Sequence, residues 1–218
     1  MSGISYEIRE FGRHGIDGAA SADVAGLHAE LLDHSPLVLM GPEFMKDFYY
    51  TVLPAERLIC GAVAYVDDRP AGFIVGTADA EGFMARAMRK HYLRIAWIMA
   101  KSVLRSPSRV LAIKEAYQIQ SNVQAEDYGP EAGELLSFGV LPEFRSRRFI
   151  KETALLVSSD LLEVAVRQLT DLGKTKLRAI VDKDNLEAQL FYRSHGWRVG
   201  LKSVKGWRVP TMEFLLDC

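Results

Sequence analysis

Cysteine is scarce in this chain, since Cys60 and Cys218 are the only two among 218 residues. No Cys-x-x-Cys pair and no cluster of cysteine with histidine occurs, which argues against a disulfide framework and a zinc site of the usual spacing. Proteins kept in a reducing compartment seldom depend on disulfides. The sequence therefore predicts a cytoplasmic protein without a metal cofactor.

Long apolar runs are missing as well. No stretch reaches the roughly 18 consecutive apolar residues of a membrane-spanning helix. The opening residues, MSGISYEIREFGRHGIDG, carry early charges and lack the apolar core of a secretory signal. The net charge is only −1. Because no global field would draw the protein to polyanions, we expect no nucleic-acid partner, and any attraction to a charged ligand has to be local.

Length and composition fit one globular domain. The chain is 49% hydrophobic and 25% charged, which is ordinary for a soluble protein with a proper core. We predict a single α/β domain over residues 1–218. Its first half reads as a strand, two helices, and two strands joined by the turn-forming cluster DDRP. These segments are residues 5–10, 21–34, 41–53, 57–66 and 71–79.

The second half alternates strands and helices before ending in two strands. A strand precedes a long helix closed by Gly173, and another strand precedes a helix that begins near Asn185 and ends at Gly196. The predicted order is β-α-β-α-β-β. The segments are residues 134–141, 149–173, 176–182, 185–196, 197–204 and 211–217.

Between the halves lies a basic helical insertion at about residues 80–118, which begins with GFMARAMRKHYLRIAWIMAKSVLR (residues 82–105). Eight Lys or Arg fall between residues 82 and 114, with no acid among them. The simplest interpretation is a solvated helix packed by its Met, Leu and Ile face. The alternatives are a lid over a cleft, or a patch for an anionic substrate, a partner or a membrane surface. Of these, peripheral membrane contact is the less favoured, and the charges exclude a bilayer span.

The stretch LPEFRSRRFIKETALLV (residues 141–157) follows a predicted strand and opens a helix. The first amides of a helix lack internal partners and carry partial positive charge, so this arrangement can bind phosphate. Arg145, Arg147 and Arg148 crowd the same turn. The pattern predicts a pyrophosphate site, and the alternative is a solvated basic turn at the end of a sheet.

A second cluster, DKDNLEAQLFYRSHGW (residues 182–197), contains Asn185 just after a strand and Tyr192 seven residues later. Two helical turns separate them, so both lie on one helix face, whereas Leu190 and Phe191 are expected to face elsewhere, into packing. Asn185 can cap the helix or bind a polar ligand. The Tyr192 hydroxyl can donate a proton to a leaving group, or it can belong to an ordinary core aromatic.

Together the two clusters resemble the GNAT family of acyl-CoA-dependent N-acyltransferases, over nearly the whole chain. The motif V-x-P-E-[FY]-R matches residues 140–145, and N-x-x-A-x-x-F-Y-x-x-x-G-W matches residues 185–197. The resemblance implies the GNAT fold, a mixed and mostly antiparallel sheet flanked by helices, in which the fourth and fifth strands splay apart. It also implies transfer of an acyl group, expected to be acetyl, from coenzyme A to an amine.

The resemblance further implies roles for individual residues. Tyr192 would protonate the departing thiolate, and Glu134 would serve as the base; Glu131 and Asp127 are weaker candidates for that role. The alternative is that Glu134 is an acid at the surface end of a strand. Strand backbone would hold the pantetheine arm, and the following turn the pyrophosphate. The positions that would contact acetyl-CoA, or another acyl-CoA, are Phe138, Val140, Arg145, Ser146, Arg147, Arg148, Phe149, Ile150 and Asn185.

The turn departs from the family pattern R/Q-x-x-G-x-G/A, because Arg148 and Ile150 stand where glycine is expected, and Ser146 where glycine is frequent. Glycine lets a backbone approach phosphate closely. Arg148 can swing aside and grip phosphate itself, the donor can sit differently or be carried by an acyl carrier protein, or the domain can be a binding or partner module that no longer catalyses.

The acceptor stays open at this stage. We expect a small-molecule or sugar amine, and the basic insertion suggests that it is anionic. The protein is expected to be a monomer or a homodimer.

Overall fold

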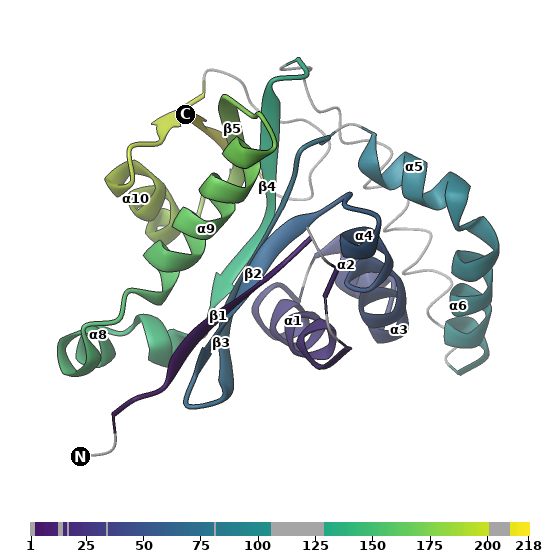
Figure 1. Cartoon of the computed structure of the whole chain (residues 1–218), viewed down its shortest axis with the longest axis horizontal. Helices are drawn as coiled ribbons and strands as arrows, with labels where there is room; N and C mark the ends of the chain where they lie inside the picture. Colours follow the sequence, from purple (N-terminus) through teal and green to yellow (C-terminus); the bar gives the residue numbers. More distant parts are fainter. Residues whose placement is uncertain are drawn as a thin grey trace.

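The computed structural model describes residues 3–12, 15–16, 18–33, 35–80, 82–105, 129–200 and 210–218, apart from the side chains of residues 19, 103 and 105. These residues form a seven-stranded sheet in the order β1-β2-β3-β4-β5-β7-β6 (Figure 1). All neighbouring strands are antiparallel except β4 and β5. The strands are β1 (Tyr6–Phe11), β2 (Cys60–Val66), β3 (Arg69–Thr77), β4 (Ala132–Val140), β5 (Lys176–Asp182), β6 (Arg198–Val199) and β7 (Thr211–Asp217).

Helices cover both faces of the sheet (Figure 1). The first helices of the chain lie on one face, and α9 and α10 lie on the other. Because β2 is covered on both sides, each of its seven residues is buried, as expected for a central strand. The helices are α1 (Gly18–Leu31), α2 (Pro36–Leu39), α3 (Pro42–Phe44), the π-helical η1 (Met45–Tyr49), α4 (Val52–Ala55), α5 (Phe83–Lys90), α6 (Tyr92–Arg105), the 3-10 turn η2 (Pro142–Arg145), α8 (Arg147–Thr153), α9 (Val157–Asp171) and α10 (Leu186–Ser194).

Several sequence predictions are confirmed. The turn after β2 uses Asp67 and Asp68 with φ of 48° and 60°, the left-handed pair that a two-residue hairpin requires. Asn185 caps α10, and Gly196 follows that helix with φ of 82°. Residues 83–90 and 92–105 of the predicted basic insertion are helical, as α5 and α6, while residues 106–118 lie outside the described part of the chain. Of the predicted strand 197–204, β6 covers Arg198–Val199.

The predicted continuous helix over residues 149–173 is wrong. The chain forms α8 and α9, separated by Ala154, whose φ is 61°. The amide of Leu155 donates to the hydroxyl of Thr153 at 3.1 Å instead of to a carbonyl one turn back, so a side chain ends the first helix. The break lets Val157 bury to 1% exposure at the start of a new helix.

Among the described residues, no helix is long and apolar enough to cross a bilayer.

Candidate functional site

Strands β4 and β5 pair over only part of their length. The ladder runs from Ala132 opposite Lys176 to Leu135 opposite Ala179 and then stops. One residue later, the register between β3 and β4 shifts at a bulge, so that Leu136 has no partner on β3. A bulge bends its strand, and β4 continues to Val140 along β3 while β5 continues to Asp182 along β7. The sheet therefore opens into a wedge.

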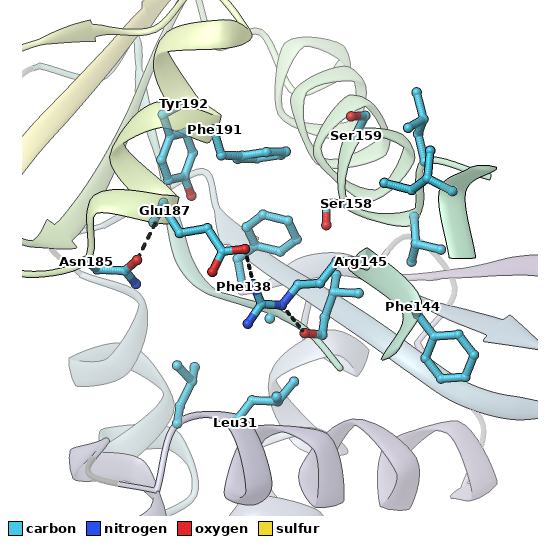
Figure 2. A pocket seen from close by; sticks show the side chains of 17 residues that line it. Leu31, Phe138, Phe144, Arg145, Ser158, Ser159, Asn185, Glu187, Phe191 and Tyr192 are labelled. Carbon is cyan, nitrogen blue, oxygen red and sulfur yellow. Dashed lines mark hydrogen bonds and ion pairs between the residues drawn. The ribbon is translucent and has the colours of Figure 1, made fainter. Parts of the chain in front are cut away.

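A cleft of about 360 Å³ occupies this wedge. Its walls come from the end of α1, the free half of β4, the turn η2, the first residues of α9 and the exposed start of α10 (Figure 2). Most lining side chains are apolar, among them Leu31, Phe138 and Phe191. Polar side chains are fewer, among them Arg145, Asn185 and Glu187, and a largely apolar lining with a few polar groups is the usual composition of a small-molecule site.

The N-terminus of α9 faces the cleft. Its N-cap residue, Leu156, provides no side-chain acceptor, and the first internal hydrogen bond runs from the Asp160 amide to the Leu156 carbonyl at 3.0 Å. The amides of Val157, Ser158 and Ser159 thus have no acceptor within the described residues. Free amides at the positive end of a 15-residue helix bind anions. The sequence motif did not point to this helix start.

The turn that the motif did point to is arranged differently. The hydroxyl of Ser146 caps α8 by accepting from the Phe149 amide at 3.2 Å. Arg148 is 86% exposed and forms an ion pair with Glu152 at 2.9 Å, and Arg147 is also exposed. Ile150 lines the cleft. The residues predicted to bind pyrophosphate therefore do not all face the cleft, because Ile150 lines it while Arg147 and Arg148 lie in solvent.

Arg145 is the arginine of this turn that lies in the cleft. Its Nε donates to the carbonyl of Val140 at 3.2 Å, and its Nη1 forms an ion pair with Glu187 of α10. Figure 2 shows the side chain crossing from the end of β4 toward α10. A guanidinium held there offers its remaining N–H groups to an anion at the mouth of the cleft.

Helix α10 supplies the other wall. The Asn185 side chain accepts from the Ala188 amide at 3.0 Å, so its capping role is confirmed and it also lines the cleft. Tyr192 is buried, and its hydroxyl points into the cleft without a hydrogen-bond partner in the described part of the chain (Figure 2). Burial raises the pKa of Tyr192 well above its ordinary value. Sequence reasoning placed Phe191 and Leu190 in packing, but Phe191 lines the cleft and Leu190 is 67% exposed.

The proposed base lies outside the cleft wall. Glu134 sits where β4 and β5 are still paired, and forms an ion pair with Arg178, which also approaches Glu213 at 3.8 Å. Desolvation raises the pKa of Glu134, and the Arg178 guanidinium opposes this shift. Of the weaker candidates, Glu131 forms an ion pair with Lys176 at 3.6 Å, and Asp127 lies outside the described residues.

Solved structures share this architecture. The acetyltransferase of the GNAT family from Streptococcus pneumoniae superposes with a TM-score of 0.53 and 13% identity, covering 98% of this chain and 100% of that one. Ard1 from Thermoplasma volcanium gives 0.54 and 15%, with 97% of each chain covered. For yncA from Salmonella typhimurium, solved with its cofactor acetyl-CoA, the values are 0.56 and 12%, with 97% and 93% covered.

No protein-family model and no curated protein matches the sequence. At these identities the structural likeness establishes the fold: this chain has the GNAT fold, as the motifs predicted.

Proposed function

We propose that this protein is an N-acyltransferase that moves an acyl group from an acyl-CoA thioester to an amine, with acetyl as the leading candidate for the acyl group. One observation carries the proposal. The cleft at the divergence of β4 and β5 joins an uncapped helix N-terminus to a buried tyrosine hydroxyl without a partner in the described residues. A protein of the same fold, yncA, was solved with acetyl-CoA, which supports an acyl-CoA as the ligand of this cleft.

The residues of the cleft fit such a donor. The amides of Val157, Ser158 and Ser159 would bind the pyrophosphate, with Arg145 adding charge at the mouth. The free edge of β4, from Phe138 to Val140, would hydrogen-bond the pantetheine arm, while the apolar walls exclude water. When bound, the donor supplies a thioester that an amine can attack.

Proton transfers fall to two residues. Tyr192 would give its proton to the departing thiolate. Its hydroxyl is protonated at neutral pH even with an ordinary tyrosine pKa, and burial raises that pKa further. Glu134 would take the proton of the attacking amine through intervening water, since its carboxylate lies beyond the cleft wall. Because desolvation raises the pKa of Glu134, its carboxylate is a stronger base than an exposed one.

Calorimetry with acetyl-CoA tests donor binding directly, and we expect a Kd of the order of micromolar. Absence of binding up to millimolar concentration, with a folded sample, would argue against the proposal and favour a non-catalytic module. An acyl carrier protein would then be the next donor to titrate.

The role of Tyr192 is tested by Tyr192→Phe, with release of free CoA measured over a panel of small amines and amino sugars. Loss of one general acid should lower kcat by about tenfold or more while leaving the Kd for acetyl-CoA unchanged. Tyr65→Phe is the matched control, because the Tyr65 hydroxyl donates to Asp23 at 2.8 Å far from the cleft. A full-rate Tyr192→Phe enzyme would remove this residue from the mechanism.

A further inference from the structure

Helix α6 is apolar on two opposite sides. Its inner side packs on the protein through Ile95 and Ile98, which are 8% and 6% exposed. Its outer side carries Leu93, Trp97 and Leu104, which are 68%, 63% and 83% exposed. Positions 93, 97 and 104 fall on one helical stripe because they are separated by four and seven residues. Packing of the domain therefore does not explain the outer stripe.

Two further exposed apolar side chains precede the stripe in the chain, Met88 of α5 and Tyr92, the first residue of α6. Together with Leu93, Trp97 and Leu104 they define the outer face of α5–α6. Within the described residues, eleven large hydrophobic side chains are exposed, and five of them lie on this face, between residues 88 and 104. Such clustering marks an interaction surface, whereas single exposed apolar residues need no explanation.

The same segment is strongly cationic. Residues 82–105 contain six of the 27 Lys and Arg and none of the 28 Asp and Glu, so the rest of the chain has seven more acidic than basic residues. Arg86 and Lys90 are neutralised by Asp79 and Glu56. Arg89 has no acidic partner in the described part of the chain, and the Lys101 Nζ lies 5.2 Å from the centre of the Trp97 ring. Positive charge thus borders the apolar stripe.

The composition of this face identifies its partner. Trp and Tyr beside leucines, bordered by Lys and Arg, are the residues that place a helix in the interface of a bilayer. A second copy of the chain would bring two cationic stripes together, which is unfavourable. We infer that α5–α6 docks on the surface of an anionic membrane, with Leu93, Trp97 and Leu104 entering the headgroup region and Arg89 and Lys101 contacting lipid phosphates.

This surface is separate from the cleft. None of the cleft-lining residues comes from α5 or α6, and Figure 1 shows these two helices at the edge of the molecule opposite α8 and α10. Docking there leaves the wedge open. The inference therefore does not rest on acyl transfer, and a failure of one proposal leaves the other intact.

Vesicle flotation of the full chain tests the inference. We expect the protein to float with vesicles that contain about 30% phosphatidylglycerol and not with vesicles of phosphatidylcholine alone, because the lipid charge must be negative. Raising the salt from about 0.05 M to about 0.5 M should weaken binding by screening.

Paired variants distinguish binding through this face from nonspecific adsorption of the protein to vesicles. Leu93→Ser with Trp97→Ser should lower the vesicle partition coefficient at least about tenfold, while Leu172→Ser with Leu190→Ser, at leucines 55% and 67% exposed elsewhere, should not. Arg89→Glu with Lys101→Glu should cause a similar loss, unlike Lys151→Glu with Lys183→Glu on other surfaces. Thermal melts establish that every variant is folded.

Four results would overturn the inference. Three of them concern vesicles: absence of binding to anionic vesicles at low salt, equal binding to neutral vesicles, and equal losses in the control variants. The fourth is a lipid-independent dimer that Leu93→Ser with Trp97→Ser dissociates, because a second copy would then cover the face.

Discussion

Two helices follow β4, and their N-termini differ in what satisfies their free amides. The seven-residue α8 is capped by its own Ser146, and its basic side chains point into solvent. The 15-residue α9 has no side-chain cap, and its first residues line the cleft. A capped helix start is already satisfied, whereas an uncapped one beside a cavity remains available to a ligand.

This difference bears on whether the absence of glycine at positions 148 and 150 would weaken phosphate binding. Arg148 is a serious departure from the family pattern only if the turn at residues 145–150 wraps the phosphates, and the 86% exposed Arg148 side chain does not enter the cleft. The helix start that faces the cleft lies after Ala154, where the backbone adopts a left-handed conformation without a glycine. The turn that matches the motif, at residues 145–150, and the helix start that faces the cleft, at Val157, are therefore two different segments of this structure.

The largest expected effect comes from placing a carboxylate at each helix start. Ser158→Asp puts a negative charge beside the proposed pyrophosphate site, and repulsion at partly buried distances should raise the Kd for acetyl-CoA at least about tenfold. Ser146→Asp makes the same change at α8 and should alter that Kd less than about twofold. Both variants should keep or gain thermal stability, because aspartate is favoured at a helix N-terminus.

The two outcomes are exclusive. If Ser146→Asp abolishes the binding of acetyl-CoA and Ser158→Asp does not, the turn before α8 is the pyrophosphate site, as the motif predicted. Unchanged melting temperatures in both variants would assign the loss to the ligand rather than to folding.

A smaller effect is expected from the arginines of the turn. Arg145 lies in the cleft and Arg148 outside it. Arg145→Met should therefore raise the Kd for acetyl-CoA by about five- to tenfold. This is the loss of one charge-assisted hydrogen bond to the ligand, reduced because the arginine no longer has to share its guanidinium with Glu187. Arg148→Met should leave the Kd within about twofold. Calorimetry at two salt concentrations checks the reason, because the affinity of the Arg145→Met protein should depend less on salt. If both variants raise the Kd for acetyl-CoA equally, Arg148 and the start of α8 contact the ligand.

Most of the fold was predictable because its signals are local. The Asp67-Asp68 turn, the cap at Asn185 and the stop at Gly196 are set by residues within a turn of each other. The break between α8 and α9 was missed because the run of apolar residues at 154–157 does not interrupt a helical pattern. It depends on the Thr153 hydroxyl and on the burial of Val157 against the sheet, which are matters of tertiary packing.

The site was predictable in part. Tyr192, Asn185, Phe138, Val140, Arg145 and Ile150 do line one cleft. Ser158 and Ser159 were missed, since two serines after an apolar run carry no distinctive pattern; the signal available was their place at the start of an amphipathic helix. The ion pair of Glu134 with Arg178 could not be foreseen, because it depends on the register of β4 against β5.

The smallest expected effect tests the break itself. Ala154 holds φ of 61°, a conformation that costs a non-glycine residue roughly 1 kcal/mol or more, while glycine costs about 0.5–1 kcal/mol in unfolded-chain entropy. Ala154→Gly should therefore stabilise the protein by up to about 0.5 kcal/mol, or raise Tm by roughly 1–2 °C. The matched control, Ala96→Gly in the exposed face of α6, should destabilise it by about 1 kcal/mol. If Ala154→Gly destabilises the protein as much as Ala96→Gly does in thermal melts, residue 154 is helical in solution. Residues 149–173 would then form the single helix that the sequence predicted, and the free amides assigned to α9 would not exist.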